Sequence, residues 1–291
     1  LNFDGRMLTL EKNVETLIHS RAANGQSTRT QITGALLQTT LNRHLDLRQP
    51  ERATSLQLKQ LLYGGNVRIV SQTQTPNGQP LSVDQLHVHS MTLDQQTGDL
   101  QAIGPGWGSS VRMQGQQNSD PNAKKPAANP LLPNSKSGLI YVRVDFQNRI
   151  TGNLLKRNIA FSRRVHTLYG PVPRWNSVLN PKIPGGLGEQ GIELISDKLI
   201  LTDTQQKNKP SLRLEAVGNT RIKSQKYSAI AHQLTYAQSN SLLTLEGVRT
   251  AAQLRRHSNK TSEPDVVAKK ILYHFDNSTV EVVGGSFFRI N

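Results

Sequence analysis

The feature that most constrains this chain is a pattern of alternating side chains that occurs twice. AHQLTYAQSNSLLTLEG begins at Ala231 and AKKILYHFDNSTVEVVGG begins at Ala268. Residues at one fixed offset correspond: Ala231, Leu234, Tyr236, Leu243, Leu245 and Gly247 correspond to Ala268, Ile271, Tyr273, Val280, Val282 and Gly284. Because successive side chains of a strand point to opposite faces, each copy predicts an antiparallel hairpin with one apolar face.

Polar turns and glycines divide the rest of the chain in the same way. AQSNS is rich in turn-forming residues, and Gly247 and Gly284 stand where a long strand bends or bulges. Weaker copies run from SDKLIL at Ser196 to LRLEAVGN at Leu212, and from VDQLHV at Val83 onwards. Self-similarity at this period indicates a repeated β unit. We therefore predict an all-β fold, a folded antiparallel sheet built from repeated long strands.

A short tag recurs at the start of several alternating runs. It reads KNV at Lys12, GNV at Gly65, RNI at Arg157 and GNT at Gly218. In each case an Asn precedes a β-branched residue.

Composition limits the classes of function. Net charge is +15, from 35 Lys and Arg against 20 Asp and Glu. This excess predicts acidic partners, namely nucleic acid, anionic lipid or acidic polysaccharide, or else serves solubility alone. With only six Phe, six Tyr and two Trp, the chain offers few platforms for stacked bases, so we expect no nucleic acid.

The absence of cysteine excludes disulfides, thiolate zinc sites and cysteine nucleophiles. No apolar run is long enough to span a bilayer. The sequence opens with Leu1 rather than Met, so we expect a mature form or an excised fragment.

Possible catalytic and metal sites are weak. His87 and His89 have a spacing that suits a metal, but no further ligand is close in sequence. GPGWGSS at Gly104 lacks the Lys of a phosphate-binding loop and is better interpreted as a turn that includes Trp107. Acidic residues show no paired motif. We predict a protein that is not an enzyme, with no cofactor and no metal.

Two segments interrupt the pattern. Residues 115–137 are rich in Pro, Asn and Lys and predict a flexible linker or loop between a domain of residues 1–114 and one of residues 138–291, although these two can also form one continuous sheet. Residues 169–191 are irregular but carry Trp175, Val178 and Leu179, which indicates an ordered excursion.

Two basic clusters follow alternating strands, so we place both at a sheet rim. Because guanidinium groups bind phosphates well, these arginines are candidates for binding an anionic headgroup, although a solvated surface is the simpler interpretation. The candidates are Arg157, Arg163, Arg164, Arg255 and Arg256.

With its alternating strands, polar turns and G-N-V tags, the chain resembles the OstA-like family, the periplasmic lipopolysaccharide-transport proteins of the LptA type. VGNTRIKSQKYSAIAHQLTYAQSNSLLTLEGVR, from Val217 to Arg249, carries the best match, and Gly65-Asn66-Val67 is a second match to the tag. Lys12 and Arg157 replace the expected glycine. The resemblance covers residues 1–110 and 191–291 loosely and is weakest over 115–190.

The resemblance implies a β-jellyroll, or β-taco, whose apolar trough shields acyl chains in the periplasm of a double-membrane bacterium and passes them toward the outer membrane. Partners would be lipopolysaccharide or another anionic envelope lipid, and homologous jellyroll domains or a second copy paired through edge strands. The predicted lining is Leu199, Leu201, Leu214, Leu234, Tyr236, Leu243, Leu245, Ile271, Tyr273, Val280 and Val282.

From the residues alone, an ordinary core is the favoured interpretation of the same apolar face, and the resemblance shifts the preference to a lipid slot. The rival interpretation is therefore a ligand-free structural β scaffold within a larger envelope protein.

Overall fold

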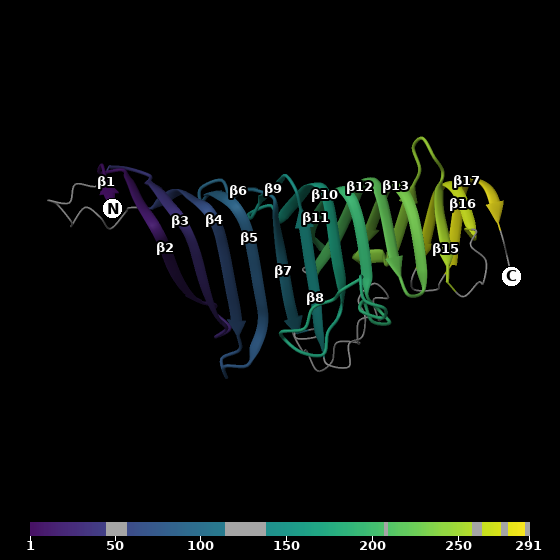
Figure 1. Ribbon diagram of the computed structural model, residues 1–291, viewed down its shortest axis with the longest axis horizontal. Coiled ribbons are helices and arrows are strands. Elements are labelled where there is room, and N and C mark those ends of the chain that lie inside the picture. Colours follow the sequence, from purple (N-terminus) through teal and green to yellow (C-terminus); the bar gives the residue numbers. More distant parts are fainter. Residues whose placement is uncertain (45–56, 114–137, 207–208, 258–263, 275–278, 289–291) are drawn as a thin grey trace. The chain divides into compact units, whose positions relative to one another are not determined.

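The computed structural model describes residues 1–44, 57–113, 138–206, 209–257, 264–274 and 279–288 (Figure 1). Most of these residues are in strands of one antiparallel sheet of 17 strands, which confirms the predicted all-β folded sheet. A single turn of 3-10 helix, η2, occupies Gln238–Asn240. Among the described residues, no helix is long and apolar enough to cross a membrane.

The chain divides into two compact units. The first comprises Leu1–Ser109 and Phe146–Phe161, and the second comprises Ser110–Asp145 and Ser162–Asn291. The segment Phe146–Phe161 thus belongs with the N-terminal residues rather than with the C-terminal domain to which we assigned it. The predicted linker, 115–137, lies outside the described residues.

The first unit is a meander of long strands. Its strands are β1 (Asn2–Phe3), β2 (Met7–Arg21), β3 (Ser27–Leu41), β4 (Leu58–Gln74), β5 (Pro80–Asp94), β6 (Asp99–Ile103), the start of β7 (Gly106–Met113) and β9 (Arg149–Asn153). Neighbours from β1 to β6 pair antiparallel in chain order, and β6 pairs with β9.

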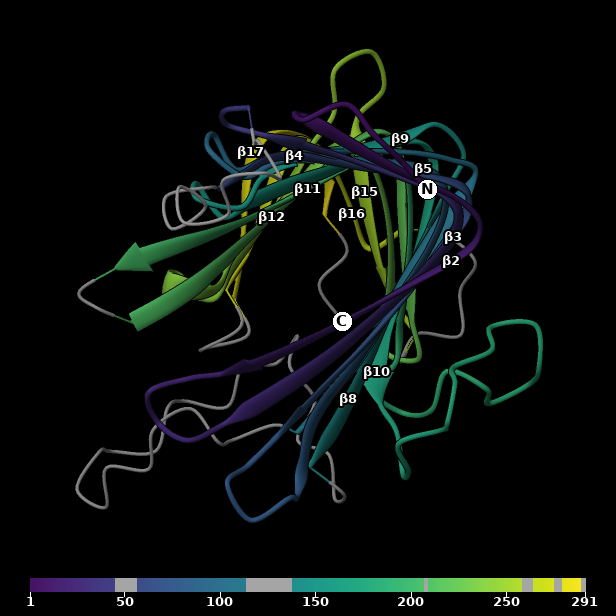
Figure 2. The same cartoon turned by 90° about the vertical axis from the view of Figure 1, so that its left-hand side faces the viewer.

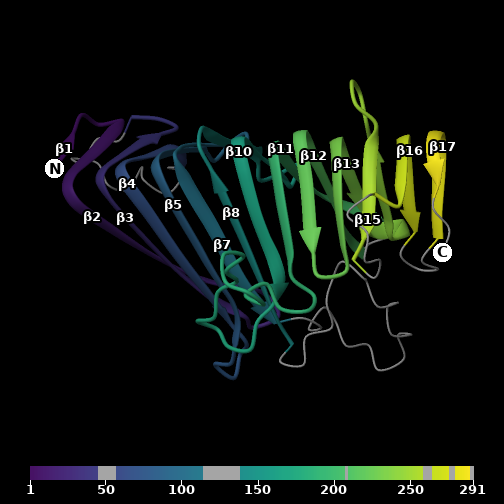
Figure 3. The same cartoon turned by 45° about the vertical axis from the view of Figure 1, so that its right-hand side comes forward.

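The second unit continues the same design, and Figure 3 shows its long strands side by side. Its strands are β8 (Leu139–Phe146), β10 (Asn158–Pro171), β11 (Ile192–Gln206), β12 (Lys209–Ser224), β13 (Tyr227–Ala237), β14 (Leu242–Glu246), β15 (Ala252–Arg256), β16 (Val266–His274) and β17 (Thr279–Phe288). The predicted hairpin at AQSNS is confirmed, because β13 and β14 pair across η2.

Within each unit, the long strands bend sharply partway along their length (Figure 2). At the bend, four strands carry two consecutive residues with positive φ, which we call a corner pair. The corner pairs are Lys12-Asn13 in β2, Gly65-Asn66 in β4, Arg163-Arg164 in β10 and Gly218-Asn219 in β12. The ladder register shifts at the pairs of β2, β4 and β12, as expected for bulges that bend a strand.

The corner pairs change the spacing of inward-facing side chains from two residues to four. In β4 the buried Tyr63 is followed by the buried Val67, and in β12 Ala216 is followed by Thr220. The residue after every pair is β-branched and nearly inaccessible, from 0% at Val67 to 7% at Val14. The tag found in the sequence therefore marks the bend of the sheet.

Three of the four tags lie at bends, whereas RNI opens the strand β10, as the sequence predicts for every tag. Arg157 has φ +50 but lies in the turn between β9 and β10, not at a bend. The corner pair of β10 is instead Arg163-Arg164, followed by the buried Val165. Lys12 keeps the corner geometry at φ +69 although it replaces glycine.

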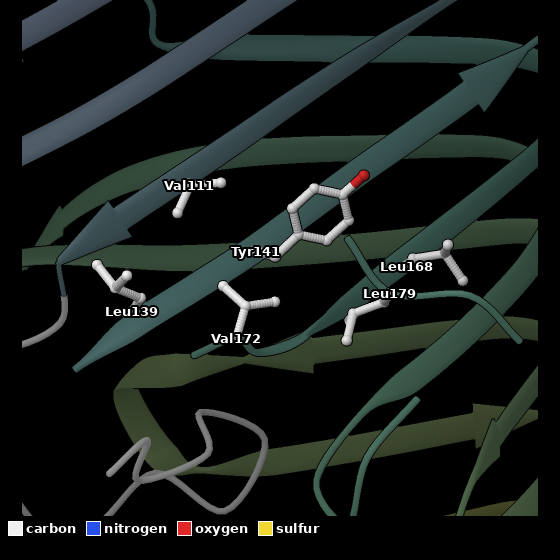
Figure 4. Close-up of a cluster of buried hydrophobic side chains, with 6 residues drawn as sticks. All are labelled: Val111, Leu139, Tyr141, Leu168, Val172 and Leu179. Atoms are coloured by element: carbon white, nitrogen blue, oxygen red, sulfur yellow. The ribbon is translucent and has the colours of Figure 1, made fainter. Parts of the chain in front are cut away.

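The irregular segment after β10 forms a second core on the outer side of the sheet. Leu168, Tyr141 and Val111 pack together with Leu139, Val172 and Leu179 (Figure 4). Trp175 and Leu187 pack against this cluster. The predicted ordered excursion is confirmed, although Val178 remains 67% exposed.

Candidate functional site

The predicted lining residues form two continuous rows across the second unit. Direct pairing in an antiparallel sheet places opposite residues on the same face. Arm A denotes the part of each strand on one side of the bend, and it contains Lys198–Gln206, Lys209–Val217, Gln233–Ala237, β14, Lys270–His274 and Thr279–Val283.

The row next to the bend, which we call the deep row, is fully packed. The register joins Leu199, Ala216, Leu234, Leu245, Ile271 and Val282. The first five are between 0% and 2% exposed, and Val282 on β17 is half-buried. This row is a solid core in the structure, with no space left at its surface for a ligand.

The next row outward, the outer row, is more open. The register joins Leu201, Leu214, Tyr236, Leu243, Tyr273 and Val280. Tyr236 and Leu243 are buried, whereas the other four are half-buried. All eleven predicted residues thus share one face, and the structure separates them into a packed row and a partly accessible row.

Small side chains line the bend itself. Thr220 pairs with Ala231, and Ala252 pairs with Ala268, all of them buried. Beyond them, arm B denotes the strand parts Ile192–Ile195, Thr220–Ser224, Tyr227–Ala231, β15 and Val266–Ala268. Short, buried side chains therefore line the inner face where the strands turn from arm A to arm B.

Tyrosines stand where the apolar interior of the second unit ends. The hydroxyls of Tyr169 and Tyr227 are buried and have no hydrogen-bond partner among the described residues. Burial raises the pKa of Tyr227, and neighbouring Tyr273 and Tyr236 add to the effect. Burial also raises the pKa of Tyr169, with a smaller contribution from Tyr236. Tyr227 lies on arm B and Tyr236 lies on arm A, so this group of tyrosines includes residues from both arms.

The first unit is apolar near its bend and polar farther out. Leu37, Tyr63 and Met91 form one buried row, and the Tyr63 hydroxyl donates to Thr16 Oγ1 over 3.1 Å. Farther along the same face, Thr30 Oγ1 lies 2.9 Å from Ser71 Oγ. A pocket of about 440 Å³ near the strand ends is lined by polar side chains: His19, Ser20, Arg21, Ser27, Thr28, Arg29, Gln72 and Gln74. The apolar rows are therefore most extensive in the second unit.

The arginine candidates are not gathered at one rim. Arg163 and Arg164 lie within β10 at the bend, so their predicted rim position is wrong. Arg157 is exposed in a turn of the other unit. Arg255 and Arg256 end β15, close to the edge of arm B. The backbone N–H of Arg256 donates to the buried carboxylate of Asp265 over 2.5 Å.

Arg255 and Arg256 face opposite sides of the sheet. Arg256 pairs with Tyr227, on the face of the buried Ala229, whereas Arg255 pairs with Ser228, on the face of the exposed Ile230. Only Arg256 therefore lies on the apolar side.

The weak metal and phosphate motifs have structural roles. His87 stacks on Trp107 with ring centroids 6.1 Å apart, which ties GPGWGSS to β5. Within the described part of the chain, no group of three His, Asp or Glu side chains is arranged to hold a metal ion.

Comparison with known proteins adds no assignment. No family model matches the chain, and no curated protein matches it.

Proposed function

We propose that the second unit binds acyl chains of lipopolysaccharide or a related anionic envelope lipid along its outer row, without catalysing a reaction. The observation that carries this proposal is the continuous apolar face of arm A, which grades from an inaccessible deep row to a half-exposed outer row. The resemblance to the OstA-like family supports the same assignment. It also suggests a periplasmic location and transfer toward the outer membrane.

The gradient defines where a lipid chain would lie. The half-buried residues form two neighbouring pairs, Leu201 with Leu214 and Tyr273 with Val280. The buried Tyr236 and Leu243 lie between these pairs in the same row. Burial of one methylene against them contributes about 0.8 kcal/mol. Binding along this row would shield several methylenes from water, and Arg256 on the same side offers a cation for a phosphate headgroup.

Partners of the proposed carrier would add to its sheet by strand pairing. β17 pairs with β16, and the backbone groups at the edge of a sheet can accept another strand. A homologous jellyroll domain or a second copy would extend the apolar face in this way.

The decisive experiment removes apolar character from the outer row and measures bound lipid. Leu214→Asp places a charge on the accessible row, so lipids carried through purification and identified by mass spectrometry should be lost. Leu245→Asp is a poorer choice, because Leu245 is 1% exposed and a buried charge there would disrupt the core. Ile230→Asp is the matched control, since Ile230 is 49% exposed on the opposite face. Lipid retention by Leu214→Asp at the level of Ile230→Asp would contradict the proposal.

A second candidate is a ligand-free structural scaffold, and the complete packing of the deep row favours it. Leu199, Leu245 and Ile271 already bury their surfaces without any ligand. Titration with a fluorescent fatty acid, at low and high salt, separates the candidates. Salt-resistant binding supports the lipid carrier, no binding supports the scaffold, and strongly salt-dependent binding of polyanions alone supports a role for the net charge only.

A further inference from the structure

We propose that the outer face of arm B in the second unit binds a phosphate group between Arg255, Lys223 and Arg221. This site lies on the opposite side of the sheet from the apolar rows, so it is independent of lipid binding there.

The register places these cations together. Ser228 of β13 pairs with Lys223 of β12 on one side and with Arg255 of β15 on the other. Directly opposite residues have Cβ atoms about 5 Å apart, so the Cβ atoms of Lys223 and Arg255 flank Ser228 at about 10 Å from each other. Arg221 is two residues from Lys223 on the same face, about 7 Å along the strand. All three long side chains can reach an anion above Ser228.

The face is open to solvent. Ile230, which pairs with Arg221 and lies two residues from Ser228, is 49% exposed. Ile195, on the other side of Arg221, is 41% exposed. A ligand therefore has access to the cations from the outside.

Arg255 has an unused donor. Its Nε is buried and has no acceptor among the described residues. A buried guanidinium N–H without a partner is costly, so a rotation of the Arg255 side chain that turns this N–H toward a ligand oxygen would relieve that cost. Arg255 can present a second N–H of its planar fork to the same anion.

Two neighbouring groups, His257 and Glu193, are held by contacts of their own. His257 Nδ1 lies 3.0 Å from the Gln225 carbonyl oxygen and so carries its hydrogen there, while Nε2 lies 3.3 Å from Ser228 Oγ. The carboxylate of Glu193, opposite Lys223, is 2.8 Å from His166 Nε2.

Asp265, a further acid among the described residues, accepts the backbone N–H of Arg256 and lies 3.7 Å from the Arg256 Nε. Within the described part of this face, the three cations outnumber the Glu193 carboxylate that lies opposite Lys223.

The chemistry favours a tetrahedral phosphate. Arg binds phosphate oxygens in bidentate fashion, and Lys adds a point charge. The same group occurs as free inorganic phosphate and as the headgroup of an anionic lipid, and the experiment must distinguish these sources.

The test is calorimetric titration of the full chain with inorganic phosphate at constant ionic strength. In parallel, the chain is sedimented with phosphatidylcholine vesicles with and without phosphatidic acid. Loss of one charge-assisted contact should weaken binding roughly tenfold or more. We expect this loss for Arg255→Gln and for Lys223→Gln. Effects on free phosphate identify the soluble ligand as the source, and effects confined to phosphatidic acid vesicles identify the lipid headgroup.

Arg213→Gln is the matched control, because Arg213 lies on the outer face of the same strand but on arm A. Equal weakening by Arg213→Gln would show that only net charge matters and would overturn the site, as would failure of both probes to bind. Leu214→Asp should leave phosphate binding unchanged, so failure of the lipid proposal and failure of this one are separately visible.

Discussion

Gly65 of the β4 corner pair can be tested against a glycine of almost the same backbone conformation. Gly65 has φ +75, and Gly78 in the turn between β4 and β5 has φ +76. A Cβ at Gly65 would lie 2.5 Å from the Cβ of Ala35 on β3, whereas a Cβ at Gly78 would meet nothing within 4 Å. The two substitutions to alanine therefore share the cost of a positive φ and differ in the clash at the bend.

The magnitudes follow from this difference. An L-residue in the left-handed region costs about 1 kcal/mol, which is the expected loss of stability for Gly78→Ala. Gly65→Ala adds a steric cost of about 1–3 kcal/mol, because a strand of the packed sheet must shift. Adding Ala35→Gly removes the clashing methyl group, so the double variant should recover most of that steric cost.

Guanidinium unfolding of the unmodified chain, Gly65→Ala, Ala35→Gly and the double variant forms a double-mutant cycle that measures the coupling between positions 65 and 35. Gly78→Ala is unfolded under the same conditions for comparison. Trp107 lies in the first unit and Trp175 in the second, so fluorescence in a Trp175→Phe background reports the first unit alone. Equal destabilisation by Gly65→Ala and Gly78→Ala, or no coupling with Ala35→Gly, would refute the argument that the bend requires close backbone approach.

Three further outcomes follow from the second unit. Arg163→Gly should raise the stability of this unit to guanidinium by up to about 1 kcal/mol, because Arg163 has φ +69; a destabilisation would contradict a strained corner pair. Tyr227→Phe should change the free energy of unfolding at neutral pH by less than about 0.5 kcal/mol, since its hydroxyl has no partner; a loss as large as that of a broken buried hydrogen bond would show a missing acceptor. The pKa of Tyr227 is raised in the folded state, so its protonated hydroxyl contributes fully to stability below the ordinary pKa of 10.0, and this contribution is lost as pH rises toward the folded pKa. Above pH 10 the melting temperature should therefore fall less for Tyr227→Phe than for the unmodified chain.

Sequence alternation predicted the hairpins and the shared face of the lining residues because strand geometry fixes which side chains point the same way. Leu234, Leu245 and Ile271 were found in this way, and the register places them in one row. Alternation does not report how closely the two arms approach. Alternation also does not show that small residues such as Ala231 and Ala252 line the bend, and only the coordinates show which rows are buried.

The β10 corner pair was missed because its residue types hide it. Glycine and asparagine tolerate positive φ, so GNV and GNT are visible signals, whereas Arg163-Arg164 resembles a surface basic cluster. The spacing from Phe161 to Val165, both buried, carries the signal that residue type does not. The outer core could be predicted only in part, because alternation places Leu168 on the outer face but does not show that the segment after β10 covers it.

The change of spacing at the bend explains how one strand pattern serves two arms. Strands with a corner pair pass from one inward residue to the next in four positions, as from Ala216 to Thr220, while partner strands need three, as from Ala231 to Leu234. The bulge lengthens alternate strands on the outside of the bend and keeps the inward faces of both arms in register. A period-two search stays in phase across a step of four but crosses a step of three out of phase, so it separates the two arms of the partner strands into unrelated runs. The repeat is therefore better defined by the steps than by the strands, because the steps alone fix which side chains of arm A and arm B share an interior.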